Sequence, residues 1–166
     1  MRAMLKGHKF GVNSIAFSPD GRSLVSASDD RSVRKWNLRD GSSKLLPVFS
    51  GFPMFFFSVA FSPNGWHVAA GNLDGSLWIW DSRTHKLVAT WQGHASDSDV
   101  YCTEFTPDGK GLMSGSEDQT VKRWDVSSLG IPQGVSTRVV NEGFPEVQSF
   151  LGHDVCYILL SSCNLD

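Results

Sequence analysis

The stretch FSPDG, Phe17 to Gly21, decides the fold of this 166-residue chain because the sequence repeats it twice. FSPNG occupies 61–65 and FTPDG occupies 105–109, so the three copies begin at positions 17, 61 and 105, in steps of 44 residues. In such a stretch proline presets φ, Asp or Asn bonds its own backbone, and glycine adopts a positive φ, so the chain reverses direction. A turn repeated at a fixed period predicts stacked copies of one supersecondary unit.

The residues around each turn alternate between apolar and polar, which is typical of half-buried β-strands. Trp36, Trp80 and Trp124 share the 44-residue spacing and lie near the end of the third segment of each unit. No segment has the apolar stripe of a helix, so the sequence predicts an all-β protein of three four-stranded antiparallel meanders. The expected strands are 12–17, 23–28, 32–37 and 44–49; then 55–61, 67–72, 76–81 and 86–91; then 99–105, 111–116, 120–126 and 146–151.

The units share a string of motifs: Gly-His, Phe-Ser-Pro-Asp-Gly, Ser-x-Ser-x-Asp and Trp-Asp. This string resembles the WD40 repeat, and the resemblance implies the blades of a β-propeller. The chain, 1–166, would then be a partial propeller with repeats at about 7–50, 51–92 and 93–151, a long loop at 127–145 and a fourth repeat begun at 152–166. RAMLKG before the first repeat and VCYILLSSC after the third resemble pieces of flanking blades.

A propeller closes its sheets into a ring of typically about four to eight blades, which leaves no long strand edge exposed. Three blades and two partial ones are too few to close a ring, so we expect an open arc. Such a chain would be a fragment, a truncated product, or one whose missing blades come from the rest of the gene or from another chain. Alone, it is expected to be marginally stable and prone to aggregation.

The resemblance also implies a buried hydrogen-bond relay in each blade, from a strand Trp through Ser and the Gly-His histidine to a turn Asp. By position, the first repeat supplies His8, Ser26, Asp30 and Trp36, and the third supplies His94, Ser114, Asp118 and Trp124. Each buried polar group needs a partner, and a chain of donors and acceptors satisfies four groups at once. The relay is therefore expected to be structural rather than catalytic.

The second repeat departs from this pattern. Phe52 stands at the histidine position and Ala70 at the serine position, while Asp74 and Trp80 remain. Losing both partners together avoids an unpaired buried group. We therefore expect Phe52 to cover the Trp80 ring, so that packing holds this blade more than hydrogen bonds do. Lys35 stands before Trp36, where the family usually has an aliphatic residue.

Composition and spacing favour no chemistry beyond binding. The net charge of −2 and the absence of a long apolar run predict no direct contact with nucleic acid or membrane. His153, Cys156 and Cys163 form a loose cluster without the paired spacing of a zinc site. The carboxylate pairs at 29–30 and 117–118 each include one relay acid, so we expect no catalytic pair, no metal and no cofactor. The odd cysteine count and the missing secretory signal favour an intracellular protein.

The resemblance places a protein-binding face around the loop before the first strand and the turn before the third strand of each blade. The corresponding residues are Asn13, Asp29, Phe55, Phe57, Leu73, Asp99, Tyr101 and Glu117. Exposed aromatic residues mark protein interfaces, and an apolar patch beside an acidic one would suit a peptide with apolar anchors and a basic flank. The alternative is that Phe55 or Phe57 turns inward to fill the space of the missing histidine.

Across its length the chain looks most like the C-terminal propeller of fungal Tup-type general transcriptional corepressors. The resemblance lies in AAGNLDGSLWIWDS, in DVYCTEFTPDGKGLMSGSEDQTVKRWDV and in the polar insertion before EVQSFLGHD. It implies a non-catalytic scaffold, in the nucleus or the cytoplasm, that binds transcription factors, histones or chromatin enzymes and does not read DNA. The alternatives are a substrate adaptor of a ubiquitin ligase, another signalling scaffold, and a regulatory propeller of a larger enzyme.

Overall fold

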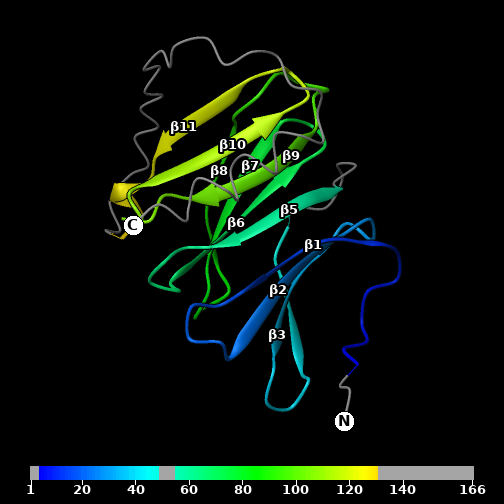
Figure 1. The fold of residues 1–166 in the computed structure, drawn as a ribbon. Helices are drawn as coiled ribbons and strands as arrows, with labels where there is room; N and C mark the ends of the chain where they lie inside the picture. Colours follow the sequence, from blue (N-terminus) through cyan, green and yellow to red (C-terminus); the bar gives the residue numbers. More distant parts are fainter. Residues whose placement is uncertain (1–3, 49–54, 131–166) are drawn as a thin grey trace.

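The computed structural model describes residues 4–48 and 55–130, and there the chain forms eleven strands and one short 3-10 turn, Ser127–Gly130. The strands belong to three antiparallel sheets that fan out side by side (Figure 1). The predicted all-β class is therefore confirmed. Among the described residues no helix is long and apolar enough to cross a membrane.

Each sheet is a meander in which strands that follow one another in the chain are hydrogen-bonded neighbours. The first sheet contains β1 (Val12–Phe17), β2 (Ser23–Ser28), β3 (Val33–Asn37) and β4 (Ser43–Leu46). The second contains β5 (Phe56–Phe61), β6 (His67–Asn72), β7 (Ser76–Asp81) and β8 (Leu87–Gln92). The third contains β9 (Val100–Phe105), β10 (Gly111–Ser116) and β11 (Val121–Asp125).

Several predicted segments lie outside the described residues. They include the strand at 146–151, most of the loop at 127–145, the repeat begun at 152–166, and Phe52. Residues 4–11, which include part of the predicted N-terminal flanking blade, contain no strand. Within the described ranges the three sheets form an open arc and not a closed ring.

The repeated turn has the geometry that its residues dictate. In the first copy the Gly21 N–H donates to the Ser18 carbonyl at 2.8 Å, and the Ser18 hydroxyl donates to the Asp20 carboxylate at 2.6 Å. Gly21, Gly65 and Gly109 have φ values of 66°, 73° and 69°, in the left-handed region where a side chain would be strained. The same short sequence thus connects the first two strands of every sheet.

The sheets pack through their first strands and their faces. The Ser58 and Thr103 hydroxyls are hydrogen-bonded at 2.9 Å between β5 and β9, and the Val59 N–H donates to the Ser14 hydroxyl of β1 at 3.2 Å. One apolar core lies mainly between the first two sheets and a second lies mainly between the last two. The second sheet is therefore covered on both faces, which explains why β7 is buried along nearly its whole length.

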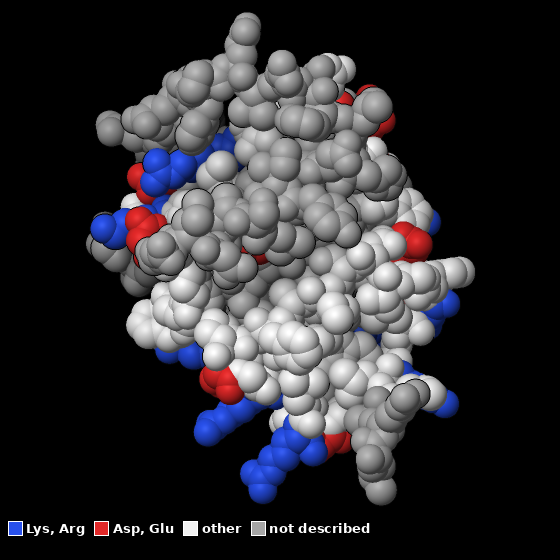
Figure 2. Space-filling view, in the orientation of Figure 1, with Lys and Arg blue, Asp and Glu red and all other residues white. Residues whose placement is uncertain are grey.

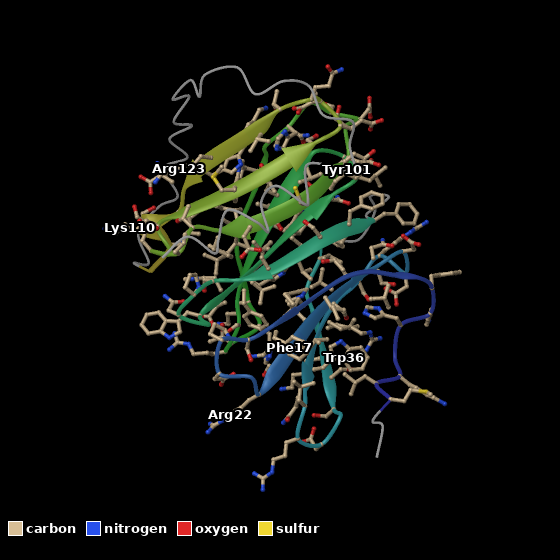
Figure 3. All side chains as sticks on the ribbon, in the orientation of Figure 1. Phe17, Arg22, Trp36, Tyr101, Lys110 and Arg123 are labelled. Atoms are coloured by element: carbon tan, nitrogen blue, oxygen red, sulfur yellow. The ribbon has the colours of Figure 1, made fainter. Side chains whose placement is uncertain are left out.

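Equivalent residues of the three sheets differ in burial because the arc has ends. Phe17, Phe61 and Phe105 hold the same position at the end of the first strand, yet they are 63%, 7% and 3% exposed. The first sheet covers Phe61 and the second covers Phe105, whereas no described residue covers Phe17. The apolar residues of β1 are thus open to solvent, whereas Trp36 of β3 in the same sheet is buried (Figure 3 labels Phe17 and Trp36).

Candidate protein-binding rim

The first sheet contains a continuous hydrogen-bond chain through the four residues expected there. The Trp36 Nε1–H donates to the Ser26 hydroxyl at 2.8 Å, and Ser26 Oγ lies 2.5 Å from His8 Nε2. His8 Nδ1 lies 2.9 Å from an Asp30 carboxylate oxygen. Because an ionised carboxylate only accepts, the proton belongs on Nδ1, and Nε2 accepts from the serine. The chain then runs in one direction, and both ring nitrogens of His8 are hydrogen-bonded.

The third sheet repeats this geometry closely. Trp124 Nε1 lies 2.8 Å from Ser114 Oγ, which lies 2.6 Å from His94 Nε2, and His94 Nδ1 lies 2.9 Å from Asp118. Burial lowers the pKa of His94, which favours the neutral ring that this chain requires. Burial alone would raise the pKa of Asp118, but hydrogen bonds from Thr120 and His94 outweigh it and hold that pKa at about 2. The pKa of Asp30 is about 2 because hydrogen bonds from Ser32 and Lys9 likewise outweigh its burial.

The second sheet has a different polar network. Trp80 Nε1 donates to the Pro47 carbonyl at 2.7 Å, so Trp80 and Asp74 are not joined in one relay. Instead, Trp78 Nε1 donates to the Ser76 hydroxyl at 2.8 Å, and the buried Asn72 donates to Asp74 at 3.0 Å and to Ser76 at 3.3 Å. The sequence pattern indicated Asp74 but not this network, because Ser76 and Trp78 lie outside the usual motif.

Phe52, which was expected to cover the Trp80 ring, lies outside the described residues, and within them Phe56 packs against this ring. Phe56 is fully buried, and its ring meets Trp78 and Trp80 edge-on at centroid distances of 6.1 Å. Edge-to-face aromatic pairs stabilise a core beyond their buried area alone. Phe56 thus fills the space beside the tryptophans, and its two neighbours Phe55 and Phe57 stay half-buried.

The predicted binding face lies at the end of the sheets where β1, β5 and β9 begin, opposite the repeated Pro-Asp-Gly turns (Figure 1). The register of each first strand shifts near its start, between Val12 and Ser14 in β1 and between Phe56 and Ser58 in β5. A bulge of this kind redirects the neighbouring side chains. It allows Phe56 to enter the core while the residues on either side remain near the surface.

The aromatic part of this rim joins the second and third sheets. The rings of Phe57 and Tyr101 meet edge-on at a centroid distance of 5.9 Å, and both residues are half-buried. Phe55 lies under the Arg31 guanidinium of the first sheet, with 5.6 Å between the guanidinium carbon and the ring centroid. Figure 3 shows Tyr101 at this end of the third sheet and Lys110 at the opposite end. Arg31 is thus a rim residue that the repeat pattern does not indicate.

The acidic part of the rim, Asp99 and Glu117, lies next to the aromatic part. The Asp99 carbonyl accepts from the Glu117 N–H at 2.9 Å, which holds the two acidic residues side by side. Burial, and secondarily the charge of Glu117, raises the pKa of Asp99. Burial together with Asp99 and Glu117 also raises the pKa of Tyr101. The field at this position is therefore negative, which favours a cationic group of a partner.

The remaining predicted rim residues, Asn13, Asp29 and Leu73, are held by hydrogen bonds to the loops around them. Asn13 donates to the Asp29 carboxylate at 2.7 Å and to the Phe56 carbonyl at 3.1 Å, so it ties the first sheet to the second. The Leu73 N–H donates to the Phe55 carbonyl at 3.0 Å. All eight predicted residues thus lie along one end of the three sheets. Asn13 and Asp29 already bond to each other there.

Other chemistry has no support in the described part of the chain. Within the described residues, 4–48 and 55–130, no group of three His, Cys, Asp or Glu side chains is arranged so that it could hold a metal ion. The cluster of His153, Cys156 and Cys163 lies outside those ranges. The expectations of no catalytic centre, no metal and no cofactor therefore stay predictions.

Comparison with known proteins identifies both the repeat and the fold. The family model described as "WD domain, G-beta repeat" matches residues 1–37, 43–81 and 85–125. The structure of U3-55K superposes with a TM-score of 0.69 at 26% identity, over 75% of this chain and 38% of that one. The WD40 repeats of RRP9 superpose with a TM-score of 0.67 at 26% identity over the same shares.

Curated relatives match over shorter parts of their own length. Ribosome assembly protein 4 of Saccharomyces cerevisiae is 56% identical over 39 residues, which are 24% of this chain and 8% of that protein. Nuclear distribution protein PAC1-2 of Uncinocarpus reesii is 30% identical over 143 residues, covering 76% of this chain and 31% of that protein. Pre-mRNA-processing factor 17 of S. cerevisiae is 28% identical over 128 residues, 76% of this chain and 28% of that protein.

The chain therefore spans less than a third of these curated relatives. The family model nevertheless covers more than half of the chain, in three successive matches that each end with the third strand of one sheet, β3, β7 or β11. The chain belongs to the WD40 family of G-beta repeats, and its sheets are blades of a β-propeller.

Proposed function

We propose that this chain is a non-catalytic protein-interaction scaffold whose rim binds a partner peptide with an apolar anchor and a basic flank. The observation that carries the proposal is the half-buried Phe57–Tyr101 pair beside Asp99 and Glu117. WD40 propellers serve as protein-interaction scaffolds, which agrees with a rim that gathers aromatic and acidic side chains from separate sheets.

The aromatic pair suits an anchor because its rings are already fixed. Phe57 and Tyr101 hold each other edge-on, so a partner side chain would order few rotatable bonds on binding. Aromatic side chains of this kind are enriched at the centres of protein interfaces. Asp99 and Glu117 would then attract a lysine or arginine next to the anchor, which fixes the direction of the peptide.

The cellular role is a finer proposal. The resemblance to Tup-type propellers supports a transcriptional corepressor that recruits transcription factors, histones or chromatin enzymes. The names of similar proteins support a second candidate, a scaffold in nuclear assembly processes, because they include a ribosome assembly protein and a pre-mRNA-processing factor. Both candidates place the chain in the nucleus and use the rim to bind another protein.

A peptide display library selected on the full 166-residue chain tests the rim. We expect enrichment of sequences with an aromatic or aliphatic residue next to Lys or Arg, and loss of this enrichment with Phe57→Ser or Asp99→Asn. Phe17→Ser and Asp108→Asn are the matched controls, because they remove an exposed phenylalanine and an exposed carboxylate at the opposite end of the sheets, where the second repeat already has Asn64 in place of Asp108. Enrichment that survives both rim substitutions would rule the rim out as the binding site.

A further inference from the structure

A second, basic site lies at the opposite end of the first sheet. A cavity of about 780 Å³ opens there, between the ends of β2, β3 and β4 and the turn that follows β7. Its lining residues are Gly21, Arg22, Ser23, Lys35, Trp36, Asn37, Leu38, Arg39, Ser42, Ser43, Lys44 and His85. Figure 2 shows Lys and Arg side chains projecting from this end, where Figure 3 labels Arg22.

Two of the lining lysines face each other across a strand pair. Lys35 of β3 is the direct partner of Lys44 of β4 in the register of the first sheet. The corresponding pair in the second sheet is the buried, apolar Ile79 and Ala89. Like charges directly opposite each other destabilise a sheet, and the hydrogen bond from Lys35 to the Ser82 carbonyl gives no reason for a second lysine at position 44. An anion between the two ammonium groups would remove the repulsion.

The first sheet also lacks, beside the cavity, an acidic residue that the other two sheets have at the equivalent position. Asn37 holds the position of Asp81 and Asp125, which end β7 and β11. In the second sheet Asp81 forms an ion pair with Arg83 at 3.6 Å. In the first sheet Asn37 carries no charge, and the equivalent Arg39 forms no ion pair with any described residue.

The nearby acidic groups bond within their own turns, and Asp20 also interacts with the charges of Arg22 and Lys35. Asp20 accepts from the Ser18 hydroxyl and the Arg22 N–H within its turn. Asp40 accepts from the Ser42 N–H at 2.8 Å and from the Asn37 side chain at 3.3 Å. Arg22 and Lys44 form no ion pair within the described ranges. The guanidinium groups and Lys44 therefore remain available to a ligand.

The lining suits a phosphoryl group on a peptide. Guanidinium groups bind phosphate oxygens in pairs, and lysine ammonium groups and serine hydroxyls supply further donors. Lys35 Nζ donates to the Ser82 carbonyl at 2.7 Å, which holds this charge at the cavity wall. Burial lowers the pKa of His85, and the charges of Lys35 and Lys44 lower it further, in agreement with a positive field. Leu38 offers an apolar contact for a neighbouring side chain.

We propose that this cavity binds the phosphoryl group of a phosphorylated peptide. A nucleic acid is the less favoured ligand, because the chain has a net charge of −2 and these basic groups are gathered at one cavity instead of along an extended surface. The proposal is independent of the rim, since the two sites lie at opposite ends of the sheets.

Fluorescence anisotropy on the full chain tests this site with three labelled probes: the peptide Ala-Gly-phosphoserine-Leu-Gly-Ala, its unphosphorylated serine form, and hexauridylate. We expect the phosphopeptide to bind at least about tenfold more tightly than the serine form, since each charge-assisted contact adds to affinity. The double substitution Arg22→Ser with Arg39→Ser should weaken phosphopeptide binding about tenfold or more. Equal binding of the two peptides, no phosphopeptide binding, or tighter binding of hexauridylate would overturn the proposal.

Two further variants separate the site from folding and from bulk charge. Lys110→Ser with Arg83→Ser removes the same charge at equivalent positions of the other sheets and should change the affinity less than about twofold. Asn37→Asp places a carboxylate at the position of Asp81 and Asp125 and should weaken phosphopeptide binding several-fold. Because Asn37 donates to Asp40 at 3.3 Å, urea unfolding of this variant checks that the new carboxylate pair leaves the chain folded. If the control pair weakens binding as much as the cavity pair does, or if Asn37→Asp leaves it unchanged, the cavity is not the site.

Discussion

The Ser114 hydroxyl is the central link of the third sheet's relay, and its removal is the sharpest test of how a sheet is held together. Ser114→Ala deletes an atom that accepts from the Trp124 indole and bonds His94 Nε2. Ser114 and the side chain of His94 are fully buried, and Trp124 is nearly so. A buried polar group left without its partner costs about 1–3 kcal/mol. With two groups stranded, we expect a loss of about 3 kcal/mol in the free energy of unfolding.

Two substitutions in the other sheets test the same reasoning, one by removing a serine hydroxyl and one by adding it. Ser26→Ala removes the equivalent link of the first sheet and should cost about 2–3 kcal/mol. Ala70→Ser places a hydroxyl at a fully buried position of the second sheet, where the Trp80 indole already donates to Pro47. That substitution should also destabilise, by about 1–3 kcal/mol, because the added hydroxyl lacks this partner.

A double-mutant cycle distinguishes a relay from two separate bonds. Urea unfolding followed by tryptophan fluorescence gives the free energy for His94→Ala, Ser114→Ala and the double variant. Because each single substitution already strands its neighbour, we expect the double variant to cost less than the two singles together, with about 1–2 kcal/mol of coupling. Strict additivity, or a Ser114→Ala variant within about 0.5 kcal/mol of the parent, would refute the relay as a stabilising unit.

Three further outcomes follow from burial, close contact and charge. Phe61→Ala should cost about 3–5 kcal/mol in urea unfolding, and Phe17→Ala less than about 0.5, because only Phe61 is buried; equal losses would show that Phe17 is covered in solution. Gly71→Ala should cost about 1–3 kcal/mol, since an added Cβ would lie 2.5 Å from Val100 Cγ1 and 2.9 Å from its carbonyl oxygen; an unchanged urea midpoint would contradict this packing. Because the pKa of His94 is lowered in the folded chain, the unfolded chain takes up a proton first, and the free energy of unfolding should fall as the pH drops below about 6.5. It should fall again below about pH 4, because Asp118 protonates in the unfolded chain before it does in the folded one. Urea midpoints that do not change across both pH ranges, or a pH dependence that Asp118→Asn leaves unaltered, would oppose this linkage.

The repeated turn allowed most of the architecture to be predicted. A Pro-Asp/Asn-Gly turn every 44 residues sets both the strand order and the antiparallel pairing, and all eleven observed strands fall within or next to the predicted segments. The relay residues of the first and third sheets lie at hydrogen-bonding distances, since a fixed motif spacing places them in the same register. These features depend on local sequence, which a repeat displays several times.

The details that escaped prediction depend on irregular backbone or on neighbouring sheets. Strict alternation gives no reason to choose Phe56 over Phe55 or Phe57 for the core, and the register shift near the start of β5 decides it. The Trp80 indole bonds to Pro47 of the preceding segment, a partner that no spacing within the second repeat indicates. Arg31 likewise reaches Phe55 from another sheet. Contacts between sheets require the packed structure.

The repeat makes departures from its own pattern interpretable. The second sheet has the apolar pair Ile79 and Ala89 where the first sheet has the opposed Lys35 and Lys44. Arg123 holds the Lys35 position in the third sheet, so the departure of the first sheet is the second, opposed lysine. Where two sheets end their third strand with a carboxylate, Asn37 leaves Arg39 without the ion pair that Arg83 makes with Asp81. Both departures add positive charge to one cavity, and local sequences that conflict with the fold are expected at functional sites. The phosphopeptide site is inferred from this coincidence, because either departure alone would be an ordinary variation within a repeat.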